Sequence, residues 1–249
     1  MTAESRIEWT EQTWNPTTGC TKVSPGCKHC YAEVMARRLC AMGNPGYKCG
    51  FKLTLHPNRL EQPLKRKKPT VYFVNSMSDL FHESIPDEFL DRVFSTIRQT
   101  PQHTYQILTK RAERLPRYFA DRDCPSNIWL GVTVEDKKYG LPRIDYLRQV
   151  EAKIRFLSIE PLLEDLGEIN LDGIHWVIVG GESGHHARPM QPIWVERIQQ
   201  QALHSNIAFF FKQWGGWGAD GIKRHKKLNG RLLQGRIWDA YPDDQRLSP

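Results

Sequence analysis

The sequence predicts an α/β fold, a partial or complete parallel (β/α) barrel of about six to seven strands. Short runs of apolar and β-branched residues alternate along the chain with segments of helical periodicity. The runs are apolar on both faces, as in parallel strands that helices cover. The length of 249 residues is that of an ordinary barrel domain. An open doubly wound sheet is the alternative architecture.

The elements are expected in the order of a repeated strand-helix unit, which implies right-handed crossovers between parallel strands. The expected strands cover residues 8–13, 71–74, 105–108, 128–134, 154–157, 176–179 and 207–211. The expected helices cover residues 31–42, 86–99, 138–150 and 192–204. The helix at 86–99 has the clearest pattern, because proline and acidic residues open it and apolar residues follow at helical spacing.

Residues 1–214 are expected to form a single barrel domain, with a cysteine loop at 20–30. Residues 215–249 are expected to form a C-terminal extension that is basic and contains glycine and tryptophan. The net charge of +7 favours anionic partners. The sequence shows no secretory h-region and no apolar run long enough for a membrane span, so we expect a cytoplasmic protein without a membrane partner. Cysteines in that reducing compartment are expected to be metal ligands or buried thiols rather than disulfides.

Three cysteines lie close together after the first expected strand. Six residues separate Cys20 from Cys27, and two separate Cys27 from Cys30. The turn at Pro25 and Gly26 allows the loop to fold back, so the spacing predicts one metal centre. Two kinds of centre remain open. A structural zinc needs a fourth ligand, for which His29, Cys40 and Cys49 are the candidates. An iron–sulfur cluster bound by three cysteines leaves one iron open.

Polar side chains follow nearly every expected strand, at the end where parallel barrels place their active sites. They include Asp79, Lys110, Arg111, Glu135, Glu160, Glu182 and Lys212. Glu135 and Glu160 could bind hydroxyl groups or an amine, or could instead form salt bridges with Lys110 or Arg111. Asp79 could cap the helix that follows it.

A glycine-rich turn follows the sixth expected strand, and Gly180, Gly181 and Glu182 within it are expected to contact a ligand. Adjacent glycines allow the backbone to approach a ligand closely; a tight turn without a ligand is the alternative. His185 and His186 are expected in a solvated or substrate-facing loop, because adjacent histidines point in different directions.

Two basic runs, at residues 65–68 and 223–227, are candidates for nucleic-acid contact. Lys48, Lys52 and Arg59 precede the first run, and Trp214, Trp217 and Trp238 flank the second. Cations beside aromatic rings suit phosphate contact and base stacking, although such runs are more often solvated surface.

Three clustered cysteines directly after the first strand of a barrel resemble the radical S-adenosylmethionine (SAM) superfamily. The chain departs from that pattern in three places. Its CX6CX2C motif has a longer first gap than most members. His29 stands where members often have an aromatic residue, and residues 75–79 replace the glycine-rich motif after the second strand.

The chain also resembles an uncharacterised family of phage and bacterial proteins with a three-cysteine motif. The shared strings lie within residues 6 to 217, at 14–20, 75–81, 108–111, 158–162, 179–184 and 211–215. This likeness brings no established reaction with it.

The first resemblance implies a [4Fe–4S] cluster on Cys20, Cys27 and Cys30, with SAM on the open iron and an electron donor as partner. Contacts to the ribose or amine of SAM are then expected from Asp79, Glu135 and Glu160. Gly180, Gly181 and Glu182 come too late in the chain to be the superfamily's amine-binding motif, and they are expected to contact the cofactor because of their place at the barrel rim. Lys212, Glu160 and Trp214 would face an anionic substrate, a nucleotide or nucleic acid, and Lys212 and Glu160 are the candidate catalytic residues. One alternative is a zinc-stabilised nucleic-acid-binding protein without catalysis. Another is a metal-free hydrolase or lyase, although the sequence contains no nucleophile elbow.

Overall fold

The computed structural model describes residues 7–242. Residues 1–6 and 243–249 of the two expected domains lie outside it. The chain forms two compact units. The first contains residues 1–23, 30–131 and 149–153, and the second contains residues 24–29, 132–148 and 154–249. A single barrel domain ending at residue 214 stays a prediction.

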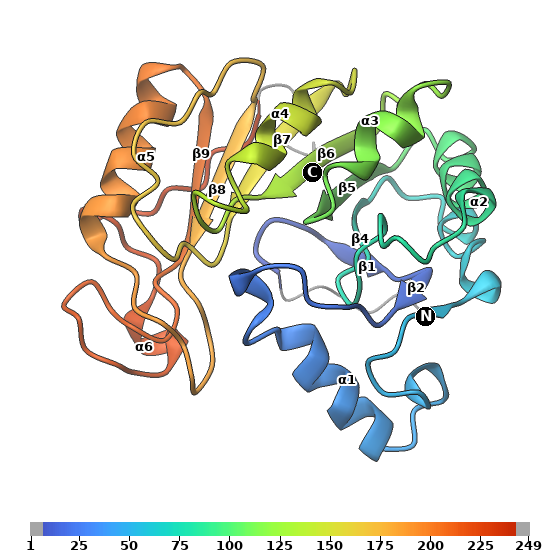
Figure 1. Cartoon of the computed structure of the whole chain (residues 1–249), viewed down its shortest axis with the longest axis horizontal. Helices are drawn as coiled ribbons and strands as arrows, with labels where there is room; N and C mark the ends of the chain where they lie inside the picture. Colours follow the sequence, from blue (N-terminus) through green and yellow to red (C-terminus); the bar gives the residue numbers. More distant parts are fainter. Residues whose placement is uncertain (1–6, 243–249) are drawn as a thin grey trace. The chain divides into compact units, whose positions relative to one another are not determined.

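Seven parallel strands form the main sheet, in the order β1-β4-β5-β6-β7-β8-β9 (Figure 1). The strands are β1 (Gln12–Trp14), β4 (Val71–Val74), β5 (Thr104–Thr109), β6 (Ile128–Thr133), β7 (Ile154–Ile159), β8 (Trp176–Gly180) and β9 (Ala208–Gln213). The order follows the chain without the reversal that marks a doubly wound sheet. In the described residues β1 does not pair with β9, so the barrel is partial. The predicted α/β partial barrel is therefore confirmed.

The helices follow the strands as expected, with local differences. They are α1 (Tyr31–Ala41), α2 (Asp87–Arg98), α3 (Arg114–Phe119), α4 (Pro142–Arg148), α5 (Pro192–His204) and α6 (Lys226–Asn229). The sequence analysis missed α3, which is short and contains Pro116. It started α4 too early, because Asp136 Oδ1 accepts hydrogen bonds from the backbone of Tyr139 and Gly140 and holds a turn there.

Other short elements lie between β1 and β4. The strands β2 (Thr17–Thr18) and β3 (Thr54–Leu55) pair antiparallel. The 3₁₀ turns are η1 (Pro25–Cys27), η2 (Pro45–Tyr47), η3 (Pro57–Arg59) and η4 (Pro63–Lys65). The first strand starts later than expected, because the backbone N–H of Thr10 bonds to the carbonyl of Ile7 in a turn.

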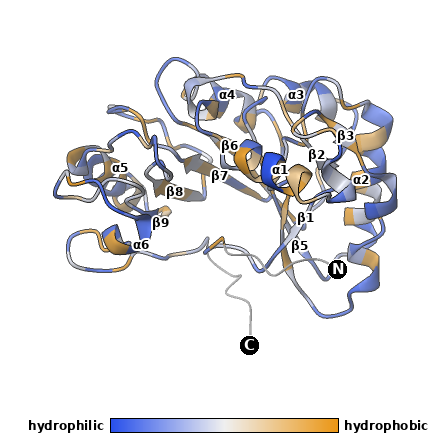
Figure 2. Ribbon diagram, turned by 90° about the horizontal axis from the view of Figure 1, so that it is seen from below, coloured by the Kyte–Doolittle hydropathy of each residue, from blue (hydrophilic) through white to orange (hydrophobic). Residues whose placement is uncertain are grey.

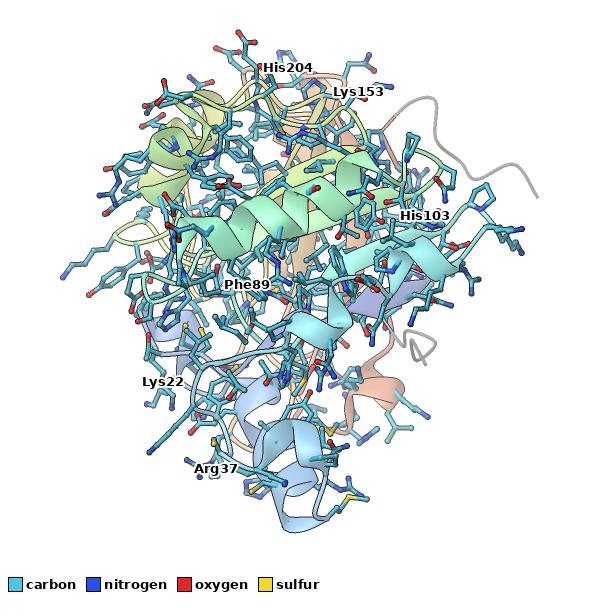
Figure 3. The ribbon with its side chains drawn as sticks, turned by 90° about the vertical axis from the view of Figure 1, so that its right-hand side faces the viewer. Lys22, Arg37, Phe89, His103, Lys153 and His204 are labelled. Carbon is cyan, nitrogen blue, oxygen red and sulfur yellow. The ribbon has the colours of Figure 1, made fainter. Side chains whose placement is uncertain are left out.

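The core of the first unit lies under the amphipathic helix α2, whose two faces differ in hydropathy (Figure 2). Phe89, labelled in Figure 3, lies in the first turn of this helix and is buried. Phe94 packs against Phe81 and Tyr118 with ring centroids 6.4 and 5.2 Å apart. Truncating such a buried ring to alanine costs about 3–5 kcal/mol.

In the second unit β8 is buried along its whole length, and residues 238–240 run beside β9. The backbone N–H of Phe211 donates to the carbonyl of Trp238, and the indole of Trp176 donates to the carbonyl of Ala240 at 2.9 Å. The described part of the extension is therefore tied to the sheet. Across residues 7–242, no helix combines the length and the apolar composition that crossing a bilayer requires.

Candidate metal and cofactor site

Cys20 is fixed at the end of the β2 segment by backbone contacts. Its N–H donates to the carbonyl of Phe51 at 3.1 Å, and that of Gly19 donates to Met77 at 3.0 Å. Gly19 has φ of +81°, and a Cβ there would lie 2.1 Å from the carbonyl oxygen of Lys52. Only glycine fits this approach, so the position of Cys20 depends on its small neighbour.

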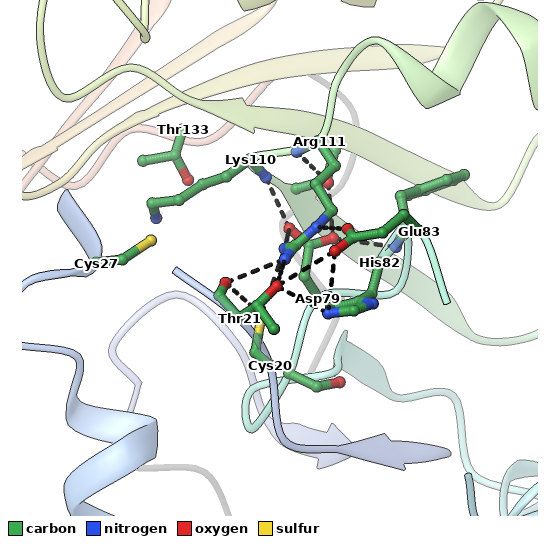
Figure 4. Close-up of polar contacts among 12 residues, drawn as sticks. Cys20, Thr21, Cys27, Asp79, His82, Glu83, Lys110, Arg111 and Thr133 are labelled. Atoms are coloured by element: carbon green, nitrogen blue, oxygen red, sulfur yellow. Dashed lines mark hydrogen bonds and ion pairs between the residues drawn. The ribbon is translucent and has the colours of Figure 1, made fainter. Parts of the chain in front are cut away.

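The guanidinium of Arg111 lies against Cys20 (Figure 4). Its Nη1 donates to the Cys20 Sγ at 3.3 Å, and its Nη2 donates to the hydroxyl and carbonyl of Thr21 at 2.7 and 3.0 Å. Its Nε donates to Glu83 at 2.7 Å. Although burial disfavours the charge, Asp79, Cys20 and Glu83 together raise the pKa of Arg111 above its ordinary value. Arg111 is therefore a permanent cation beside the sulfur.

Asp79 is nearly covered, with 8% of its side chain exposed, and it accepts four hydrogen bonds from the first unit. The donors are Phe81 N at 3.0 Å, Thr109 Oγ1 at 2.7 Å, Lys110 N at 2.9 Å and Arg111 Nη1 at 3.3 Å. A carboxylate has about four acceptor positions. These contacts make Asp79 a positioning residue for Arg111, whereas a direct contact to SAM stays a prediction.

His82 contacts Thr21, the neighbour of Cys20, on the same segment. The backbone N–H of Ser84 donates to its Nδ1 at 3.1 Å, so a neutral ring carries its proton on Nε2, which lies 3.0 Å from the Thr21 hydroxyl. Burial, aided by the charge of Arg111, lowers the pKa of His82. The ring therefore stays neutral beside the cation.

Cys27 lies in the second unit, in the turn η1, and a buried carboxylate holds that turn. The Ser24 hydroxyl donates to Glu135 Oε1, and Arg143 Nη1 donates to Oε2 at 2.5 Å. Glu135 is fully buried. A Cβ at Gly26 would lie 3.0 Å from this carboxylate. Glu135 thus forms a salt bridge with Arg143, and its expected pairing with Lys110 or Arg111 stays a prediction. Contact between Glu135 and SAM stays a prediction.

A second carboxylate braces the same turn. Arg188 donates from Nε and Nη2 to the two oxygens of Glu182 at 2.8 and 2.5 Å, and from Nη2 to the carbonyl of Pro25 at 3.0 Å. His29 stacks on His186 with ring centroids 5.7 Å apart. Glu182 is 6% exposed. Its observed contacts therefore connect the glycine-rich loop to the turn that carries Cys27.

Glu160 and Lys212 form a partly exposed ion pair of the second unit. Lys212 Nζ donates to both oxygens of Glu160, at 2.9 and 3.0 Å, and the two side chains are 15% and 19% exposed. A Cβ at Gly180 would lie 3.2 Å from the Glu160 carboxyl carbon. The absence of a side chain at Gly180 therefore leaves space for this pair, which the sequence analysis named as catalytic candidates.

Gly181 has a packing function in the structure. A Cβ at this position would lie 2.0 Å from the carbonyl oxygen of Trp214. Trp214 itself is buried, and its indole donates to the carbonyl of Leu232 at 2.8 Å. The expected substrate contact of Trp214 and the expected ligand contacts of Gly180 and Gly181 stay predictions.

The other cysteines have separate environments. None of the six, all within the described residues, forms a disulfide. Cys30 and Cys40 pack against one apolar cluster of the first unit, whereas Cys49 is exposed. The structure does not draw three or more Cys, His, Asp or Glu side chains of residues 7–242 into one group with the geometry of a metal site.

Three polar residues that hold the cysteine segment were missed by the sequence analysis, namely Ser24, Arg143 and Arg188. Arg143 is 6% exposed and lies on α4. It stands on the same side of this helix as the buried Leu147, four positions later. A positive charge on the apolar side of a helix is the signal that could have identified it, because such a charge requires a buried partner.

Comparison with known families gives a direct result. Residues 4–242 match the model of the family described as Protein of unknown function (DUF5131). The chain belongs to this family. No curated protein matched the chain. The predicted resemblance to an uncharacterised family is thereby confirmed.

Solved structures of spore photoproduct lyase resemble the chain. A mutant of that enzyme has 13% sequence identity over 81% of this chain and 63% of its own, with a TM-score of 0.50. A form with bound AdoMet and dinucleoside spore photoproduct has 14% identity over the same shares, with a TM-score of 0.46. The DUF5131 chain thus spans less than two thirds of the lyase, and the likeness at a TM-score of 0.50 shows that the two proteins share a fold.

Proposed function

We propose that this protein is an iron–sulfur enzyme of the radical SAM type that acts on an anionic substrate, a nucleotide or nucleic acid. The supporting observation is the donor set on this fold. Cys20, Cys27 and Cys30 are all partly exposed and outside any disulfide, and the sulfur of Cys20 faces a permanent cation. Thiolate ligands suit iron–sulfur clusters and zinc alike. The donor set therefore fits a [4Fe–4S] cluster.

The fold and the charge of the chain support the rest of the proposal. Spore photoproduct lyase, which shares the fold, has been solved with AdoMet and a dinucleoside photoproduct. The net charge of +7 suits a polyanionic substrate. A cluster with SAM supplies one-electron radical chemistry, and a separate electron donor is required. Such chemistry needs reduced thiols, so we place the protein in the cytoplasm.

The chain's own residues would hold the cysteine ligands in place and neutralise negative charge on the ligands and the substrate. Arg111 holds positive charge at Cys20, and Glu135 and Arg188 fix the turn that carries Cys27. Lys212 and Glu160 are the candidates for substrate contact. Lys212 can transfer a proton or neutralise a developing negative charge, and Glu160 orients its ammonium group.

Anaerobic purification and reconstitution with iron and sulfide test the proposal. We expect about four irons per chain and cleavage of SAM after reduction. Cys27→Ala should lose both, whereas Cys124→Ala, which changes a partly buried cysteine outside the motif, should keep both.

Two results would overturn the proposal. A protein with one zinc and no SAM cleavage would be the zinc-stabilised nucleic-acid-binding protein. Hydrolase or lyase activity that survives Cys27→Ala would indicate a metal-free enzyme.

The Lys212→Met variant tests the substrate contact, because it should lower turnover while the iron content stays unchanged.

A further inference from the structure

Residues 221–238 of the second unit, here called the basic arm, carry six cations and no carboxylate. The cations are Lys223, Arg224, Lys226, Lys227, Arg231 and Arg236. The arm contains the short helix α6, from Lys226 to Asn229. A concentration of positive charge on one segment attracts polyanions.

The basic arm is anchored to the segment that follows β9. The backbone N–H of Trp214 donates to Gly230 O at 3.2 Å, and the side chain of Asn229 donates to Gly215 O at 2.9 Å. Lys223 Nζ donates to the carbonyl of His185 at 2.5 Å. The arm is therefore fixed to the end of the strand that carries Lys212 and to the loop that carries Glu182.

Two cations of the arm serve its own structure. Arg224 forms an ion pair with Asp220 at 2.6 Å, and Arg231 lies 4.9 Å above the ring of Phe210. The other four, Lys223, Lys226, Lys227 and Arg236, are exposed. Within residues 7–242 no carboxylate forms an ion pair with any of these four. They are available to bind phosphate groups.

The aromatic rings of Trp238, in the arm, and Trp217, just before it, already have cations and hydrogen-bond partners. Arg236 lies 3.4 Å above the ring of Trp238, and Lys223 lies 5.7 Å from that of Trp217. Both indole N–H groups donate to backbone carbonyls, at 3.1 and 2.7 Å. Base stacking on these rings is thus hindered, so recognition would depend on charge and would ignore base sequence.

Exposed apolar side chains accompany the cations, and Leu228 and Leu232 are 76% and 57% exposed. Figure 2 shows hydrophobic colour at α6 next to hydrophilic segments. A helix of only four residues is too short to lie in a membrane interface as an amphipathic helix. Because the helix is so short, the basic arm suits nucleic acid better than a lipid surface.

We infer that the basic arm is a docking surface for the phosphate backbone of nucleic acid. Binding there would bring the nucleic-acid strand to the end of β9. The inference rests on the proposed nucleic-acid class of substrate, and it goes further by naming the surface. It assigns the phosphate contacts to Lys223, Lys226, Lys227 and Arg236, and it makes the binding independent of sequence.

Fluorescence anisotropy with a labelled oligonucleotide of mixed sequence tests the inference on the full-length protein. Each phosphate contact makes the affinity fall about threefold between 50 and 200 mM salt. The Lys226→Gln/Lys227→Gln variant should therefore reduce that salt effect by roughly tenfold and bind more weakly at low salt. Lys67→Gln/Lys68→Gln removes the same charge from the other basic run and serves as the matched control.

The outcomes separate this inference from the proposed function. Weaker binding with a smaller salt effect in the first variant alone supports it. Equal losses in both variants, or an unchanged first variant, would overturn it, as would a preference for anionic phospholipid vesicles over DNA. SAM cleavage is measured on the same samples and should be equal in all three proteins. If the wild-type protein itself does not cleave SAM, the enzyme proposal is contradicted, and the binding result stays valid.

Discussion

The Nη1 atom of Arg111 lies 3.3 Å from the Sγ atom of Cys20, and only 9% of the Arg111 side chain is exposed. A hydrogen bond from a charged donor in such a covered site is worth about 1.5–3 kcal/mol. Asp79 holds the guanidinium in place from the other side. This contact favours the thiolate form of Cys20, which is the form that binds metals and reacts with electrophiles.

Replacing Arg111 should therefore slow the chemistry of Cys20. In the metal-free Arg111→Gln variant we expect iodoacetamide to label Cys20 on the order of tenfold more slowly at neutral pH. Peptide mass spectrometry over a time course measures the rate. Arg117→Gln changes an exposed arginine of the same unit and should label normally. An unchanged rate in Arg111→Gln would show that the cation does not activate the sulfur.

The sequence predicted the sheet well, for a physical reason. Strands buried on both faces need continuous apolar residues, and runs such as 71–74 and 176–179 are apolar throughout and too short for a buried helix. The parallel arrangement then gathers the strand ends, so Asp79, Glu135 and Glu160 were identified as residues of the barrel rim.

The partners of those residues could not be predicted. Ser24 and Glu135 are 111 positions apart, and Arg111 and Cys20 are 91 apart. No periodicity connects positions so distant, because their contact depends on how the loops close after the sheet has formed. The expected pairing of Glu135 with Lys110 or Arg111 stays a prediction, and its observed partner Arg143 was missed. Arg143 is closer in sequence, but a helix start misplaced by several residues concealed it.

The buried pair of Glu135 and Arg143 should contribute to stability through both partners. Removing one partner leaves an uncompensated charge, which costs about 3–5 kcal/mol. We expect Arg143→Met to lower the free energy of unfolding in urea by this amount. The double variant Glu135→Gln/Arg143→Met should lose clearly less than the two single variants added together, since it buries no unpaired charge. Additive losses would mean that the two groups do not interact.

His56 should make the protein sensitive to acid. Its Nε2 lies 2.8 Å from the Thr18 hydroxyl, and burial, with the nearby charge of Arg59, lowers the pKa of His56 to about 4. The unfolded chain, with the ordinary value near 6.5, binds the proton first as the pH falls. The stabilisation is therefore complete above pH 6.5 and is lost between 6.5 and about 4. Because solvent reaches the partly buried ring and screens part of the effect, the loss is on the order of 2 kcal/mol.

Unfolding in urea at pH 7.5 and 4.5 measures this effect. The wild type should lose more stability on acidification than His56→Gln, which has no proton to bind at this position. His204→Gln, at an exposed site, should follow the wild type. Equal pH dependence in all three proteins would assign the acid sensitivity to other buried histidines.

Gly180 and Gly181 are adjacent, yet alanine at the two positions should have different effects. At Gly181 a Cβ would lie 2.0 Å from the backbone oxygen of Trp214, which cannot move without disturbing β9. At Gly180 the nearest atoms belong to the Glu160 carboxyl, at 3.2 and 3.3 Å, and a side-chain end can shift. The first substitution should therefore affect folding, and the second should affect the pair that Glu160 forms with Lys212.

We expect Gly181→Ala to lower the free energy of unfolding by about 3 kcal/mol or more, as overpacking against the backbone does. Gly180→Ala should stay within about 1 kcal/mol of the wild type, while substrate turnover falls because Glu160 no longer holds the Lys212 ammonium at 2.9 Å. Urea unfolding and iron content, measured on both variants, separate the two effects. A folded, fully active Gly180→Ala would show that Glu160 and Lys212 need no fixed geometry. A stable Gly181→Ala would mean that the segment after β9 yields more readily than its hydrogen bonds to the basic arm imply.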